Sequence, residues 1–420
     1  MLGGWSTLRH RDFALVCFAR FAVTLALHVT NVAIGWYIYD VTGSALALGF
    51  LGVAGIVPVL ALALVTGFIT DRFDRRLILF GSDLALTGTG LALLWLITAG
   101  YGIVWPVYLI VMLISAGRAF HQPASQAIVP ALVPSQQLPG AIAFSSGIFQ
   151  SAQIIGPALG GILYAIGAWL PFAIAVALSA TASAAALAVR HRSTQEGGRM
   201  PVTVSSLLAG FQYTLSKPVV LGAVSLDMFV VMFGGVVLLL PVFAKDVLDV
   251  GPEGLGFLRA APAVGAIGMA MWLAGNRFVH HNTGRRLFMT ILVYGAATAA
   301  FGLSSSFILS LVCLAIVGAS DMVSVVIRHT LVQAETPDQL RGRVSAVNSL
   351  FISSASELGQ IRAGGLAELL GAVPAVVAGG LAAIGLAVVW PRLFPKLAQR
   401  KHLLEAEPAG NRTAGADAAS

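Results

Sequence analysis

Apolar segments of membrane-crossing length dominate this chain. A helix needs about 20 mainly apolar residues to cross the hydrocarbon core of a bilayer. Segments of that kind follow one another along the chain with short polar loops between them, and they leave little room for a soluble domain. The predicted spans are 13–38, 45–69, 78–99, 103–121, 140–165, 169–189, 218–243, 254–275, 287–303, 307–328, 343–369 and 372–391.

The composition excludes most soluble classes of protein. Of the 420 residues, 57% are hydrophobic and 10% are charged, whereas a soluble domain carries about 25% charged residues. The two cysteines, Cys17 and Cys313, both lie within apolar segments and are too few for a metal or disulfide framework. We therefore expect an all-α membrane protein without a metal or another cofactor.

The basic residues lie mainly in alternate loops. If the number of spans is even, most of the 25 Lys and Arg residues fall on the side of the two termini, and Lys245 is alone in the opposite loops. Cytoplasmic loops of membrane proteins carry such an excess. The pattern predicts that both termini are cytoplasmic, and it explains the net charge of +7 without a nucleic-acid partner.

The two halves of the chain resemble each other. Gly49-Phe50-Leu51 is followed by Arg75-Arg76-Leu77, and Gly256-Phe257-Leu258 is followed in the same order by Arg285-Arg286-Leu287. Transporters built from parallel repeats bind their substrate between the halves, near the midplane of the bilayer. The predicted domains are an N-terminal six-helix bundle (1–190), a cytoplasmic linker (191–217), a C-terminal six-helix bundle (218–392) and a disordered cytoplasmic tail (393–420).

The most specific motif lies between the second and third spans and reads Gly67-Phe68-Ile69-Thr70-Asp71-Arg72-Phe73-Asp74-Arg75-Arg76. It resembles the G-x-x-x-D-R-x-x-R-R loop signature of the major facilitator superfamily. The resemblance implies a conformational switch whose contacts form in one state and break in the other, with the arginines reaching carboxylates across the bundle. The alternative is a loop whose charges only set topology. The predicted switch residues are Gly67, Asp71, Arg72, Arg75 and Arg76.

The fifth span carries Gly156-Pro157-Ala158-Leu159-Gly160-Gly161, which resembles the G-P-x-x-G-G core of the antiporter motif in exporters of this superfamily. Proline bends a helix, and Gly156 and Gly160 give a flat face for close packing. Segments 119–124 and 130–134 resemble the bacterial branch of drug and siderophore exporters, which includes macrolide efflux proteins and enterobactin exporters. The resemblance implies twelve transmembrane helices in two pseudo-symmetric six-helix bundles, a monomer, and a bacterial inner-membrane location.

Charged residues inside membrane spans are functional candidates, because they are costly to place there. Arg118 and Asp321 occupy equivalent positions in the two halves and are expected to face each other across a cavity. We hypothesise that Asp227, Asp321 or Glu357 carries a coupling proton. For Glu357 the alternative is a structural ion pair with Arg362. The proton and substrate candidates are Asp227, Asp321, Glu357, Arg20, Arg118 and Arg362.

These features predict a secondary active transporter and not an enzyme. The sequence has no G-x-x-x-x-G-K-[ST] loop for ATP. The expected partners are a small drug-like or siderophore-like substrate, the lipid bilayer and H⁺, with export by alternating access and proton antiport. Two alternatives stay open: an importer or facilitator of a small nutrient, and a membrane sensor or assembly protein that does not transport.

Overall fold

The computed structural model describes residues 9–191, 211–275 and 282–400, and within these residues the chain is helical without a β-strand. The first half contains α2 (Arg11–Thr42), α3 (Ala45–Arg72), α4 (Arg75–Thr98), α5 (Trp105–Ile128), η1 (Val129–Ala131), η2 (Ser135–Gln137), α6 (Leu138–Ile166) and α7 (Leu170–Ala188). The second half contains α9 (Pro218–Gly234), α10 (Val236–Val242), η3 (Phe243–Val247), α11 (Gly251–Gly275), α12 (Thr283–Leu303), α13 (Phe307–Glu335), α14 (Asp338–Leu370), α15 (Ala372–Leu393) and α16 (Pro395–Ala398).

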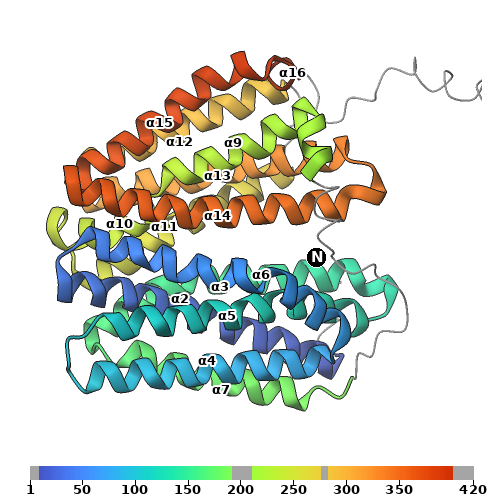
Figure 1. The fold of residues 1–420 in the computed structure, drawn as a ribbon, viewed down its shortest axis with the longest axis vertical. Coiled ribbons are helices and arrows are strands. Elements are labelled where there is room, and N and C mark those ends of the chain that lie inside the picture. The colour runs from blue at the N-terminus through green and yellow to red at the C-terminus, as the bar shows by residue number, and fades with distance from the viewer. Residues whose placement is uncertain (1–8, 192–210, 276–281, 401–420) are drawn as a thin grey trace, which may run out of the picture.

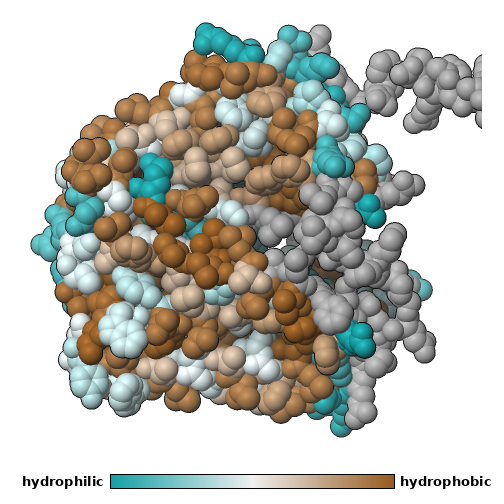
Figure 2. Space-filling view, in the orientation of Figure 1, coloured by the Kyte–Doolittle hydropathy of each residue, from teal (hydrophilic) through white to brown (hydrophobic). Residues whose placement is uncertain are grey.

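The long helices make this a multi-pass membrane protein. Ten of the described helices are long and apolar enough to cross a bilayer, and α5 and α14 add two more long helices of 24 and 33 residues. Hydrophobic side chains cover much of the visible outer face (Figure 2). Large apolar residues such as Trp95, Leu113 and Met271 are exposed, as expected for a surface in contact with lipid. The prediction of an all-α protein with twelve transmembrane helices is confirmed.

Two bundles lie one above the other, α2 to α7 below and α9 to α15 above (Figure 1). Within the first bundle, α2 packs on α6 and α7, and α4 packs on α5 and α7. Within the second bundle, α12 packs on α13 and α15, and α11 packs on α13. The bundles contact each other mainly through two helix pairs, α3 with α14 and α6 with α11.

The helices have two ends, for which we use two names. The terminal end holds Arg11 and Arg400, together with the α3–α4 and α13–α14 connections, and lies on the right in Figure 1. The far end holds the α2–α3, α4–α5 and α14–α15 connections. Local signals set these turns. Gly43 ends α2 with a φ of 61°, and the Ser44 side chain then caps α3 by accepting a hydrogen bond from the Ala47 amide at 3.2 Å.

Glycines let the two bundles approach each other closely. In α3, a methyl group added at Gly52 would lie 2.7 Å from the carbonyl oxygen of Glu357 in α14. In α6, a methyl group at Gly161 would collide with the Pro252 carbonyl and lie 2.8 Å from Gly256 in α11. Real Cβ contacts are essentially never this short, so both interfaces need glycine at these positions.

The structure corrects two predicted boundaries. The seventh span, predicted as one helix over 218–243, is broken at Gly234-Gly235 into α9 and α10 and continues into the short π-helix η3. The tail, predicted to be disordered from 393, remains ordered to Arg400, because α16 forms and the Arg400 carbonyl accepts a hydrogen bond from the Gly284 amide at 3.0 Å. Residues 401–420 and most of the linker lie outside the described residues.

The Gly161 contact predicts a stability difference between two conservative variants. Gly161→Ala should destabilise the protein by about 1–3 kcal/mol, because the methyl group forces α6 and α11 apart. Gly88→Ala in α4 is the control, because no atom lies within 4 Å of a methyl group there. Tryptophan fluorescence during heating of the purified full chain measures the apparent unfolding temperature. Equal temperatures for the two variants would contradict the packing argument.

Candidate functional site

A cavity of about 430 Å³ lies between the two bundles. Asn31, Ile114 and Arg118 line it from the first bundle, while Asp321 and Glu357 line it from the second. Most of its remaining wall is apolar or glycine, with Val230, Val231, Gly234, Gly235, Val236, Val237 and Leu238 among the lining residues. A largely apolar cavity with a few placed polar groups is the usual form of a small-molecule site.

The charged groups of this cavity come from both bundles and have both signs. Arg118 comes from α5 of the first bundle, whereas Asp321, Glu357 and Arg259 come from the second bundle. Arg259 Nη1 donates to the carbonyl of Asn31 in the first bundle at 3.0 Å. The Asp321 side chain is 46% exposed, so it is accessible from the cavity. The structure therefore brings three of the six predicted charged candidates, Arg118, Asp321 and Glu357, to one cavity. Arg118 and Asp321, which occupy equivalent positions in the repeat, both line it.

Glu357 lies where the cavity meets the α3–α14 interface. Its Oε2 accepts a hydrogen bond from Gln360 Nε2 at 2.7 Å. A methyl group at Gly55 of α3 would lie 3.0 Å from the same oxygen, so the carboxylate sits directly against that helix. A change in the charge of Glu357 therefore acts on a contact between the two bundles.

Asp227 is held in a buried ion pair beside the cavity. Its Oδ1 lies 2.5 Å from Arg328 Nη1, and the two side chains are only 6% and 3% exposed. Arg328 Nη2 also lies 3.7 Å from Asp321 Oδ1. Sequence analysis placed Arg328 at the end of a span, but α13 continues to Glu335, which puts this arginine inside the bundle.

Arg20 lies in a second, smaller pocket of about 130 Å³ within the first bundle. It donates to Ser145 Oγ at 2.8 Å and stacks over the Phe149 ring at 5.1 Å. This pocket shares Asn31 and Arg118 with the central cavity, so the two spaces adjoin. Arg20 is therefore brought near the cavity without lining it.

Arg362 supports the broken helix and does not pair with Glu357. Its Nε and Nη2 donate to the carbonyl oxygens of Met232 and Phe233 at 3.1 and 2.7 Å. The last carbonyls of a helix lack partners within the helix and attract cations. Arg362 thus satisfies the end of α9 where the chain breaks, which is a structural task that its position in the sequence does not reveal.

The loop motif contacts helix ends. Arg75 Nη1 donates to the carbonyl of Ala127 at 2.9 Å, and Arg76 Nη1 donates to the carbonyl of Val189 at 2.7 Å. These carbonyls lie at the ends of α5 and α7, so the two arginines connect three helices of the first bundle. The expectation that they reach carboxylates across the bundle does not hold for these contacts. Arg72 is exposed, and the surroundings of Gly67 and of the Asp71 side chain lie outside the described part.

The Gly156-Pro157-x-x-Gly160-Gly161 motif packs α6 between two neighbours. Methyl groups at Gly156 and Gly160 would lie 2.5 Å from His28 Cβ and 2.8 Å from the Val29 carbonyl of α2, while Gly161 faces α11. The motif therefore places the wall of one bundle against a helix of the other. Its association with antiport stays a prediction.

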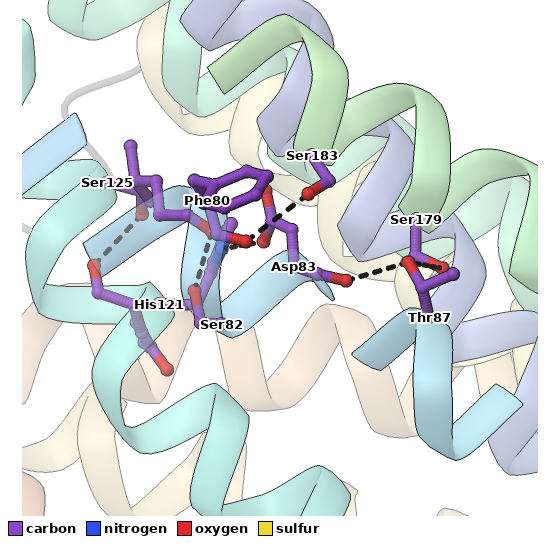
Figure 3. Close-up of polar contacts among 10 residues, drawn as sticks. Phe80, Ser82, Asp83, Thr87, His121, Ser125, Ser179 and Ser183 are labelled. Atoms are coloured by element: carbon purple, nitrogen blue, oxygen red, sulfur yellow. Dashed lines mark hydrogen bonds and ion pairs between the residues drawn. The ribbon is translucent and has the colours of Figure 1, made fainter. Parts of the chain in front are cut away.

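Sequence analysis missed a buried acid and base in the first bundle. Asp83 of α4 is 0% exposed, and its Oδ1 lies 2.7 Å from His121 Nδ1 of α5 (Figure 3). The signal was available, because Asp83 falls within the predicted span 78–99 and intramembrane acids are functional candidates.

A multi-pass fold of two six-helix bundles with a charged cavity between them defines a transporter of the major facilitator type. The chain belongs to the transmembrane secretion effector family of that superfamily, whose family model matches residues 2–406. The family assignment thus covers nearly the whole chain, including both bundles.

Characterised relatives are efflux proteins. The chain is 26% identical over 381 residues to macrolide efflux protein A of Streptococcus pyogenes, covering 87% of this chain and 91% of that protein. It is 27% identical over 410 residues to the enterobactin exporter EntS of Escherichia coli K12, covering 95% of each. A POT family transporter solved with 5-aminolevulinic acid shares the fold, with a TM-score of 0.72 at 13% identity, covering 92% of this chain and 96% of that one.

The ion-pair geometry predicts different effects for two neighbouring acids. Asp227→Asn should cost about 3–5 kcal/mol, because it leaves the charge of Arg328 buried without its main partner. Asp321→Asn should cost at most about 1 kcal/mol, because that side chain is half exposed and its contact is long. Folded yield by size-exclusion chromatography and the apparent unfolding temperature measure this. Equal losses for both variants would contradict the assignment of Asp227 to a structural pair.

Proposed function

We propose that this protein exports a small organic molecule across the bacterial cytoplasmic membrane by alternating access, in exchange for protons. One observation carries the proposal: the central cavity is built from both bundles and holds two carboxylates and two arginines among largely apolar walls. A rocking motion of one bundle against the other would expose such a cavity to each side of the membrane in turn.

Polar contacts between the bundles at the far end support one end state of that motion. Asp40 Oδ1 lies 2.5 Å from Lys245 Nζ, and Ser44 Oγ donates to Glu368 Oε2 at 2.9 Å. Tyr39 also donates to Asp246. Each of these pairs joins the first bundle to the second at the far end. Among the described residues, polar contacts thus close the far end, and opening it requires all three to break.

The orientation follows from the charge distribution. Most basic loop residues lie on the side of the terminal end, and this excess marks the cytoplasmic side of membrane proteins. The terminal end, with both termini, is then cytoplasmic, and the arrangement closed at the far end is an inward-facing state. A substrate enters from the cytoplasm in this state and leaves after the far end opens.

The carboxylates of the cavity are the proposed sites of proton exchange. A charged acid within the membrane is costly and is favoured to bind a proton when its access to water falls. Asp321 and Glu357 both line the cavity, so an arriving substrate can displace their protons. Asp227 is less suited to this role, because Arg328 already neutralises it.

The proposed substrates are amphipathic drug-like molecules or siderophores. The relatives support this class, since one is named for macrolide efflux and the other for enterobactin export. The cavity supports it as well, because its wall combines apolar side chains with separated charges. An importer of nutrients would show movement in the opposite direction, and a non-transporting sensor would show none.

Inverted membrane vesicles containing the full chain test this proposal. A proton gradient is imposed, a pH-sensitive dye reports its size, and macrolides, fluorescent cations and catecholate siderophores are added in turn. We expect one class to collapse part of the gradient, and Asp321→Asn to lose most of that response.

Asp249→Asn provides the matched control, because Asp249 is an exposed loop residue with a φ of 50°, a conformation that asparagine tolerates. The control should respond like the wild type. A response that survives in Asp321→Asn would remove this acid from the mechanism. The cytoplasmic face of the membrane is on the outside of inverted vesicles. Movement of substrate out of the vesicles would therefore indicate an importer.

A further inference from the structure

A histidine and an aspartate form a buried pair in the first bundle, away from the carboxylates of the central cavity. The two side chains are 7% and 0% exposed, and His121 Nδ1 lies 2.7 Å from Asp83 Oδ1. They join α5 to α4 in the interior of the bundle (Figure 3). Neither residue belongs to the loop motif or to the wall of the central cavity.

The hydroxyl groups around Asp83 serve the backbone and not its carboxylate. Thr87 donates to the carbonyl oxygen of Asp83 at 2.8 Å, and Ser183 donates to the carbonyl of Phe80 at 3.3 Å. Ser179 donates to the carbonyl of Ala175 at 2.8 Å. Within the described residues, Asp83 Oδ2 is buried and has no hydrogen-bond partner. Among the described residues, His121 is therefore the group that can compensate a negative charge on the Asp83 carboxylate.

One proton decides the net charge of the pair. An ionised Asp83 beside a neutral imidazole places one uncompensated negative charge in the interior of the membrane protein. An added proton gives either an imidazolium–carboxylate pair or a neutral acid beside a neutral imidazole, and both arrangements have no net charge. An isolated buried charge costs several kcal/mol more than a neutralised one, so burial favours uptake of the proton.

The second bundle provides an internal comparison. Its buried acid, Asp227, is neutralised by Arg328 at 2.5 Å. A guanidinium group stays protonated in proteins, whereas an imidazole changes its charge between about pH 5 and pH 8. One bundle thus has a fixed ion pair, and the other pairs its buried acid with a group that can gain or lose a proton.

The pair is accessible from the smaller pocket. His121 lines this pocket together with Gln122, Ser125 and Arg118 of the same helix, and the pocket adjoins the central cavity. Ser125 and Gln122 belong to the half of α5 that leads to the terminal end. A proton can therefore reach His121 without crossing the closed contacts at the far end.

Charged neighbours oppose the uptake. The other ionisable groups that line the pocket of His121 are Arg118 from α5 and Arg20 and His28 from α2. From α6 and α7 the facing polar groups, Gln153, Ser179 and Ser183, are uncharged. The cations of the pocket repel a proton on His121, while the carboxylate of Asp83 attracts it, so the two influences act against each other.

We infer that Asp83 and His121 form a second proton-binding site, which is loaded from the terminal end and lies in the first bundle. Proton binding itself follows from the pair and its pocket. Its use in transport rests on the proposed function, because only an exchanger would couple the release of this proton to substrate movement.

Infrared difference spectroscopy of the purified full chain in lipid tests proton binding without a substrate. Spectra are compared between about pH 8 and about pH 5, the range in which imidazole changes its charge, with histidine isotopically labelled. We expect an imidazolium or carboxylic-acid band that disappears in both His121→Gln and Asp83→Asn. Asp227→Asn is the control and should retain this band. If Asp227→Asn does not fold, Asp321→Asn takes its place. A spectrum unchanged by His121→Gln would overturn the inference.

Transport in vesicles tests the coupling role separately, with the macrolides, fluorescent cations and catecholates named above. His121→Gln should retain exchange of a responding compound at equal concentrations on both sides but lose most of its accumulation driven by the pH gradient. Full accumulation in His121→Gln, with a normal wild-type response, would refute the coupling role. No wild-type response to the gradient would refute the proposed function while leaving the infrared result decisive for the proton site.

Discussion

Backbone contact between the two bundles is the constraint on which the rest of this structure depends. Helices in lipid gain little from hydrophobic burial against one another, so their association relies on close packing. Gly52 allows α3 to touch α14, and Gly161 allows α6 to touch α11. Because these contacts lie toward the far end, they join the bundles there and leave a cavity between them that both bundles line.

The intramembrane charges fall into two groups according to what compensates them. Arg362 is satisfied by the carbonyls at the helix break, and Arg328 by Asp227. These contacts hold helices of the second bundle together. Asp321 and Glu357 instead line the cavity, and the proposed exchange requires their charge to be compensated in turn by protons and by substrate. In this account, the charges with permanent partners keep the bundle rigid, and the charges that line the cavity are the ones that respond to protons and substrate.

The sequence predicts the helices well and the contacts of their charges poorly. Apolar length and loop charge are local properties, so all twelve spans could be placed. The break at Gly234-Gly235 was missed, because an apolar run contains no sign of the arginine from α14 that stabilises it. Arg328 was placed at the very end of a span, but α13 extends past the apolar run and puts it inside the bundle. Asp83 carried a usable signal, but its pairing with His121 depends on the packing of α4 and α5.

Distances between spin labels test the central claim that the bundles move as two bodies. One pair of labels, at Phe73 and Leu393, measures the distance between the terminal ends of the two bundles. A second pair, at Tyr101 and Leu369, measures the distance between the far ends. A third pair, at Phe73 and Leu187, lies within the first bundle, and all five side chains are exposed. Across a change of pH, or on adding a macrolide that responds in vesicles, the account predicts that the terminal distance shortens, the far distance lengthens and the internal distance stays constant. Two inter-bundle distances that never change, or that change in the same direction, would contradict it.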